Sequence, residues 1–127
     1  MTKRILSVTV CLLLVFATTA AMLMPAAALT YIKSADAGLS KSGTTAHLSC
    51  SVTGYQGLTT SCKITANLQQ YKNGAWTTID TWTQSYNSYR GTLSASRTVA
   101  AGFSYRVLAS VTGNTETISI TSKTVSF

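Results

Sequence analysis

Hydrophobic and polar residues alternate along most of the chain beyond residue 30, and the alternation is clearest on either side of Asn73-Gly74. One alternating run covers residues 62–72 and a second covers residues 75–84. A period of two is typical of a β-strand that buries one face. Asn-Gly between two such runs favours a type I′ turn, because both central residues of that turn need a positive φ. The pattern therefore predicts a β-hairpin closed by a two-residue turn.

A two-residue turn fixes how the two strands pair. Lys72 then faces Ala75, and Leu68 faces Ile79 on the side that we expect to be buried. The other members of the buried side are Cys62, Ile64, Ala66 and Gln70. The outward side is expected to hold the pairs Tyr71 with Trp76, Asn67 with Asp80 and Thr65 with Trp82, and also Gln69. The register thus predicts an aromatic row with polar neighbours on an outer sheet surface.

A three-residue loop with a bulge is the alternative, and it would shift the register by one residue. That shift turns Trp76 and Trp82 toward the core and buries Asp80, which has no evident cation beside it. Burying an unpaired carboxylate costs several kcal/mol. We therefore prefer the two-residue turn.

Further alternating runs, separated by turn-forming residues, continue to the end of the chain. With the hairpin they predict strands over residues 30–39, 45–53, 62–72, 75–84, 90–99, 103–112 and 115–127, with a turn at Gly113-Asn114 before the last one. Seven antiparallel strands at this spacing indicate one all-β domain over residues 29–127, an immunoglobulin-like or fibronectin-III-like β-sandwich. The sixth strand has no cysteine, whereas a true immunoglobulin domain carries one there, so the fibronectin-III-like variant is favoured.

The first 28 residues have the three parts of a secretory signal peptide. Lys3 and Arg4 form a basic start, an apolar stretch runs from residue 5 to about residue 23, and small residues spaced Ala-x-Ala end at Ala28. We expect cleavage after Ala28 and a secreted, extracellular domain with no stable membrane insertion. The alternative is an uncleaved signal anchor, because the apolar stretch approaches the ~20 residues that span a bilayer.

Cys50 and Cys62 are the two cysteines beyond residue 28. Both occupy inward positions of consecutive predicted strands, and an exported chain meets an oxidising environment. They predict a buried disulfide, which would close a loop of ~13 residues and stabilise the fold by roughly 3 kcal/mol. Two buried free thiols are the alternative. No metal site is expected, because two sulfurs and the distant His47 give too few ligands for zinc.

The chain is basic, with 10 Lys and Arg residues against 3 Asp and Glu residues and a formal charge of +7. Loss of Lys3 and Arg4 with the signal leaves 8 basic against 3 acidic residues, a charge of +5. These cations are spread along the strands rather than clustered. The charge therefore favours weak attraction to extracellular polyanions and does not indicate a nucleic-acid partner.

Several short stretches of residues 29–127 are similar to those of a known family. They are Tyr31-Ile-Lys, Ser40-Lys-Ser-Gly, Leu68-Gln-Gln-Tyr-Lys-Asn-Gly-Ala-Trp, Trp82, Ser96-Arg-Thr-Val and Tyr105-Arg-Val. Through them the chain resembles an uncharacterised family of short secreted proteins of Gram-positive bacteria. The resemblance implies a signal peptide followed by one β-sandwich, and it implies no activity. Phe103 to Ala109 also resembles the strand of fibronectin-III-like modules in which a tyrosine packs at a corner.

The residues expected for catalysis are few. His47 occupies an outward position with no nucleophile beside it in the sequence. A glycosidase needs two carboxylates flanking the scissile bond, and the three available acids are Asp36, Asp80 and Glu116. No Gly-rich phosphate loop is present. The sequence therefore predicts that the protein is not an enzyme and uses no cofactor.

The outward aromatic residues favour a binding module, because exposed aromatic patches usually mark an interaction site. The expected ligand-binding residues are Tyr71, Trp76, Trp82, Asn67, Gln69 and Asp80. Their ligand would be a cell-wall polysaccharide, another extracellular polyanion or a protein partner. Alternatively, the rings only shield the sheet or belong to the core. A second function, a secreted cationic effector of the bacteriocin type, is favoured by small size, export and charge, although no amphipathic helix supports it.

Overall fold

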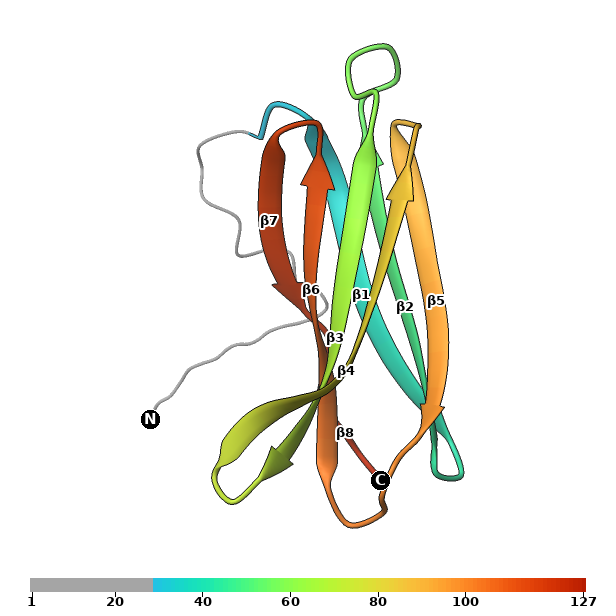
Figure 1. Ribbon diagram of the computed structural model, residues 1–127, viewed down its shortest axis with the longest axis vertical. Coiled ribbons are helices and arrows are strands. Elements are labelled where there is room, and N and C mark those ends of the chain that lie inside the picture. The colour runs from blue at the N-terminus through green and yellow to red at the C-terminus, as the bar shows by residue number, and fades with distance from the viewer. Residues whose placement is uncertain (1–28) are drawn as a thin grey trace.

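The computed structural model describes residues 29–127, which form two antiparallel sheets packed face to face (Figure 1). Along the chain the strands are β1 (Ile32–Ser42), β2 (Thr45–Gly54), β3 (Cys62–Lys72), β4 (Ala75–Tyr86), β5 (Arg90–Thr98), β6 (Ser104–Gly113), β7 (Glu116–Thr121) and β8 (Val125–Ser126). One sheet has the order β1-β2-β5 and the other β4-β3-β6-β7, with β8 also paired to β6. The all-β, fibronectin-III-like sandwich is confirmed. The predicted signal peptide, residues 1–28, lies outside the described residues.

The turn between β3 and β4 is the predicted two-residue turn. Asn73 and Gly74 have φ values of 54° and 79°, and Lys72 pairs with Ala75. Both central residues are therefore left-handed, which is what a type I′ turn requires. The preference for this turn over a three-residue loop is confirmed, and the next pair, Tyr71 with Trp76, follows the predicted register.

A β-bulge changes the register of this hairpin farther from the turn. Gln69 still pairs with Thr78, but Leu68 pairs with Asp80, so that Ile79 is an extra residue in β4. Side chains alternate along a strand. Beyond one extra residue, each side chain of β4 therefore points to the opposite face of the sheet from the one predicted. The predicted pairs Leu68 with Ile79, Asn67 with Asp80 and Thr65 with Trp82 are wrong. The observed pairs are Leu68 with Asp80, Asn67 with Thr81, Ala66 with Trp82 and Thr65 with Thr83.

The turn before β7 lies one residue later than Gly113-Asn114. Gly113 is the last residue of β6 and pairs with Glu116, and Asn114 takes the left-handed φ of 53°. Asparagine tolerates this conformation better than most residues. Gly113 is needed for a different reason, because a Cβ atom there would lie 3.0 Å from Cγ1 of Ile32. The start of β1 thus packs directly on the backbone of β6.

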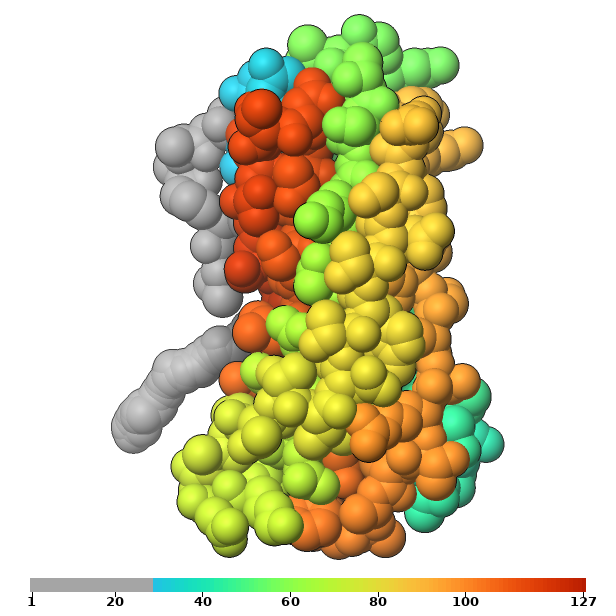
Figure 2. All heavy atoms as spheres, viewed as in Figure 1, coloured from blue at the N-terminus to red at the C-terminus, as the bar shows by residue number. Residues whose placement is uncertain are grey.

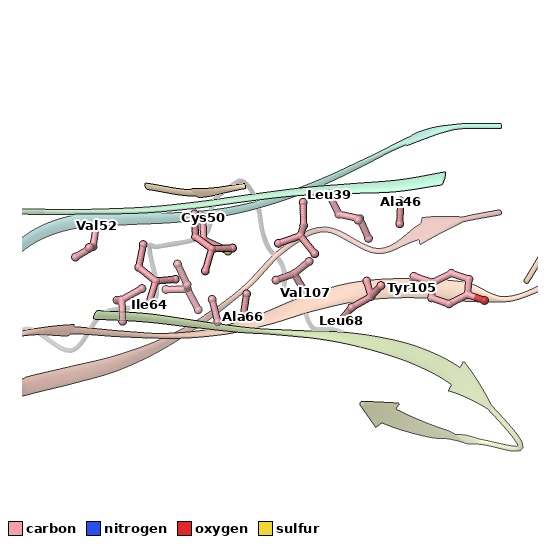
Figure 3. Packing of buried hydrophobic residues seen from close by; sticks show 14 of the residues in the cluster. Leu39, Ala46, Cys50, Val52, Ile64, Ala66, Leu68, Tyr105 and Val107 are labelled. Atoms are coloured by element: carbon pink, nitrogen blue, oxygen red, sulfur yellow. The ribbon is translucent and has the colours of Figure 1, made fainter. Parts of the chain in front are cut away.

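The core lies between the two sheets, where inward side chains of both meet (Figure 3). The labelled members are Leu39, Ala46, Cys50 and Val52 from one sheet and Ile64, Ala66, Leu68, Tyr105 and Val107 from the other. Tyr105 is fully buried, and its hydroxyl donates to the Ala100 carbonyl at 2.7 Å. A bond to the backbone a few residues upstream is the tyrosine corner of such sandwiches. This is the corner packing that the resemblance of residues 103–109 implied.

Cys50 of β2 and Cys62 of β3 lie in this core and come from facing sheets. Their inward orientation is confirmed, and the structure holds them as free thiols. Burial raises the pKa of the Cys50 thiol to about 12 and also raises the pKa of Cys62. Both thiols are therefore protonated at neutral pH. The disulfide stays a prediction.

Residues 115–127, predicted as one strand, form two strands separated at Ser122. The Ser122 side chain is buried, and its hydroxyl accepts the Val107 N–H at 2.8 Å. The Ser122 N–H donates to the Val107 carbonyl, also at 2.8 Å. A side chain that replaces a backbone acceptor interrupts the regular ladder. The chain leaves the sheet here and returns as β8.

The neighbouring edge strands β4 and β5 belong to different sheets (Figure 1). The Tyr86 hydroxyl of β4 donates to the Thr92 carbonyl of β5, and the Arg97 guanidinium of β5 donates to the Ile79 carbonyl of β4. A Cβ atom at position 91 would lie 2.2 Å from Cδ2 of Tyr86, so Gly91 makes room for this ring. These two hydrogen bonds connect the sheets along one side of the sandwich.

Candidate ligand-binding surface

The end of the β3–β4 hairpin carries two aromatic rings on the outer face of its sheet. Tyr71 and Trp76 are directly opposite each other, and their ring centroids are 5.1 Å apart with an interplanar angle of 58°. Tyr71 is 45% exposed, whereas Trp76 is half-buried. Figure 2 shows this end of the hairpin as a lobe at the lower left of the molecule. The outward position predicted for both rings is confirmed.

Arg106 of β6 covers Trp76, and this contact was not predicted. The guanidinium carbon lies 4.2 Å from the ring centroid, within the range of a cation–π interaction. Its Nε donates to Oε1 of Gln69 at 2.8 Å, and Nε2 of Gln69 lies 3.3 Å from the Thr78 hydroxyl. Burial lowers the pKa of Arg106, but an arginine stays charged in proteins. We call Gln69, Tyr71, Trp76 and Arg106 the Trp76 cluster.

Asn67 lies on the same outer face, farther from the turn. Its Oδ1 accepts the Thr81 hydroxyl at 2.8 Å, and Thr81 is the residue that the bulge places opposite it. The predicted outward orientation of Asn67 and Gln69 is confirmed, although Gln69 is buried beneath its neighbours. Of the six residues predicted for the surface, four therefore share one outer face.

Trp82 and Asp80 do not belong to this face, contrary to the prediction. Both lie beyond the bulge, so they have the inward parity of their strand, and Trp82 packs against the core. An inward Asp80 was expected to have no cation beside it. Its carboxylate lies 3.5 Å from Nη1 of Arg97, with both side chains 40% exposed. Arg97 comes from the other sheet, which is why the hairpin sequence gave no indication of it.

The three acidic residues are all placed away from the Trp76 cluster. Asp80 pairs with Arg97, and Asp36 belongs to β1 of the opposite sheet. Glu116 begins β7, and its carboxylate accepts backbone N–H groups of Thr30, Tyr31 and Ile32. The cation of Arg106 is therefore not neutralised by a neighbouring carboxylate among residues 29–127. A ligand at this cluster would meet a positive potential.

His47 lies on the outer face of the other sheet. It pairs with Ser40 on one side and with Ser96 on the other, while Asp36 pairs with Ser51. Four residues of strand separate His47 from Ser51, roughly 13 Å. At that distance Asp36 does not orient the imidazole as the carboxylate of a catalytic triad does. Within residues 29–127 no cluster of His, Cys, Asp or Glu is suited to a metal ion.

No protein-family model and no curated protein matches the chain. Among solved structures the chain is similar to the E. coli curli protein CsgC, with 12% sequence identity and a TM-score of 0.39. The similarity covers 68% of this chain and 94% of CsgC. In the part of the chain that the structure describes, no helix reaches the length and hydrophobicity needed to cross a membrane.

Proposed function

We propose that the protein is a secreted binding module without catalytic activity, and that the Trp76 cluster binds an anionic extracellular glycan such as a cell-wall polysaccharide. The supporting observation is the Arg106 guanidinium 4.2 Å from the Trp76 ring centroid, with the Tyr71 ring exposed beside it. An aromatic ring offers an apolar surface to a sugar ring. A guanidinium binds a carboxylate or phosphate through two parallel hydrogen bonds.

The hydrogen bonding of Arg106 supports an anionic ligand. Among residues 29–127, its side chain donates one hydrogen bond, from Nε to Gln69. A guanidinium has five N–H donors, so four remain for a ligand or water. The bond to Gln69 also fixes the plane of the guanidinium. A preoriented donor set loses less conformational entropy when a ligand binds.

The experiment measures binding of the chain starting at Leu29 to a soluble cell-wall polysaccharide that carries carboxylate or phosphate groups. Arg106→Gln should weaken binding about tenfold or more, because a hydrogen bond to a charged group contributes roughly 1.5 to 3 kcal/mol. Trp76→Ala should also weaken binding, because it removes the apolar ring surface offered to the sugar. The matched control is Arg90→Gln. Arg90 also lies over an aromatic ring, 5.3 Å from that of Tyr89. It is the first residue of β5, and that strand begins at the end of the domain opposite the β3–β4 turn (Figure 1).

Binding that survives Arg106→Gln and Trp76→Ala would contradict the proposal. If binding instead disappears at high salt and falls equally in the Arg90→Gln control, the association is electrostatic and unspecific. That result would favour the second candidate, a secreted cationic effector. The observation in its favour is that Asp80 and Glu116 are held by internal partners, while most Lys and Arg residues are exposed.

A further inference from the structure

A carboxylate at the start of β7 holds three consecutive residues at the start of the described chain. Oε2 of Glu116 accepts the Thr30 N–H at 2.8 Å, and Oε1 accepts the N–H groups of Tyr31 and Ile32 at 2.8 and 2.9 Å. Hydrogen bonds to an ionised acceptor are shorter and stronger than neutral ones. The bond from Thr30, with those from Tyr31 and Ile32, lowers the pKa of Glu116 against a smaller opposing effect of burial.

Other groups complete a site around the same segment. The Thr59 hydroxyl donates to the Tyr31 carbonyl at 2.6 Å, and Leu29 packs against the core. A Cβ atom on Gly113 would lie 3.3 Å from the Tyr31 carbonyl oxygen, so the glycine lets this backbone approach β6 closely. Residues 29–32 are thus held by the β2–β3 loop, by the end of β6 and by the first residue of β7.

This segment begins where the signal peptide is predicted to end. Cleavage after Ala28 would turn the Leu29 nitrogen into an α-ammonium group. Consecutive backbone nitrogens are about 3 to 4 Å apart, and the Thr30 nitrogen is 2.8 Å from Oε2 of Glu116. The new charge would therefore form at most about 7 Å from Oε2 of Glu116.

We propose that Glu116 is a binding site for the protein's own N-terminal ammonium group, which exists only after removal of the signal peptide. In the precursor, residue 29 contributes a neutral peptide group. In the mature chain it contributes a positive charge and additional N–H donors. Processing thereby strengthens the contact between the start of β1 and β7, and the mature domain is more stable than the same domain with residues before Leu29. This inference rests on the predicted cleavage site and does not depend on glycan binding.

The other charged and titratable groups nearby do not mimic this effect. The segments that form the site carry Tyr31, Lys33 and Tyr55 in addition to Glu116. None of these three side chains is a carboxylate. An upward shift of the pKa of the N-terminal amine would consequently report its contact with Glu116.

The experiment compares a chain that starts at Leu29 with one that retains Ala27 and Ala28, each with Glu116 or with Glu116→Gln. The pKa of the N-terminal amine is measured by NMR after ¹³C reductive methylation. We expect it to lie about half a unit or more above its ordinary value of about 7.7 to 8.0 in the Leu29 chain with Glu116. It should be ordinary in the other three chains. The urea midpoint should fall on extension with Ala27-Ala28 only when Glu116 is present.

Equal amine pKa values in the Glu116 and Glu116→Gln chains would overturn the proposal. If Glu116→Gln does not fold, the Leu29 chain and the extended chain, which both keep the carboxylate, still decide it through their two amine pKa values. Mass spectrometry of the exported protein tests the cleavage site directly. An N-terminus at any residue other than Leu29 would also overturn the proposal.

Discussion

Trp76 and Trp82 lie on the same strand, six residues apart, and yet they occupy different environments. Trp76 is on the outer face beneath Arg106, near the hairpin turn. Trp82 packs against the core on the far side of the bulge at Ile79. In a regular strand two residues an even number apart share one face. The difference shows that the bulge divides β4 into a tip, where Trp76 lies on the outer face, and a second half, where Trp82 packs against the core.

The largest expected effect is a difference in the free energy of unfolding between the Trp82→Ala and Trp76→Ala variants. Trp82→Ala should lower the free energy of unfolding by about 3 kcal/mol, because a ring packed on the core is lost and a cavity remains. Trp76→Ala should lower it by about 1 kcal/mol or less, since its ring is half-exposed and contacts Tyr71 and Arg106 on the outer face instead of packing in the core. Urea unfolding of both variants measures the difference. Equal losses would mean that β4 is not divided in this way.

The predicted disulfide would strengthen the second half of the hairpin, because Cys62 pairs with Tyr86 at the end of β4. The oxidised protein should be about 3 kcal/mol more stable than the reduced protein. Thiol titration of the unfolded exported protein, without reductant, should find no free thiol. The variant with both Cys50→Ala and Cys62→Ala is the control, since its stability should not respond to reductant. Two titratable thiols would contradict the prediction.

Reduction should also introduce a dependence on alkaline pH. Burial raises the pKa of Cys50 from an ordinary value of 9.0 to about 12, so the folded state holds the thiol proton more tightly than the unfolded chain. The stability of the reduced protein is therefore complete below about pH 9 and declines as the pH rises from 9 toward 12. The variant with both Cys50→Ala and Cys62→Ala should lack this decline, because burial raises the pKa of both thiols. Urea unfolding at several pH values would measure the difference.

A smaller effect is expected at the bulge itself. Arg97→Met should cost about 1 kcal/mol, because it removes one hydrogen bond to the Ile79 carbonyl and a half-exposed ion pair with Asp80. Asp80→Asn should cost less, since the bond to the carbonyl remains. In a Trp76→Phe background, Arg97→Met should also increase acrylamide quenching of Trp82. Unchanged stability and quenching would show that the bulge does not depend on Arg97.

A similar stability effect is expected at the tip. Arg106→Met removes a cation–π contact that contributes roughly 0.5 to 1 kcal/mol and also the hydrogen bond from Nε to Gln69, so its total cost should be comparable to that of Arg97→Met. In a Trp82→Phe background it should make Trp76 clearly more accessible to acrylamide, because the guanidinium no longer covers the ring. Lys63→Met, an exposed position of β3, is the control and should leave Trp76 unchanged. Equal quenching with and without Arg106 would contradict the observed contact.

The hairpin turn, the inward set from Cys62 to Leu68 and the Tyr71–Trp76 pair could be predicted because each depends on residues close in sequence. The bulge could not, since the cation that lies beside Asp80 and binds the Ile79 carbonyl is Arg97 of the other sheet. Arg106 was missed for a similar reason. The alternation of residues 103–112 places it outward, but only the strand order brings β6 beside β3. The alternation of hydrophobic and polar residues within a strand does not show which strands distant in sequence come into contact.

The two hydrogen bonds between β4 and β5 have a consequence for self-association. An exposed strand edge is a template for another chain, which pairs with a continuous row of free N–H and C=O groups. Arg97 occupies the Ile79 carbonyl on one edge, and Tyr86 occupies the Thr92 carbonyl on the neighbouring edge. A second copy that approaches this side meets two interrupted rows and the bulky side chains that interrupt them. The residues that join the sheets therefore also protect this side against edge-to-edge aggregation.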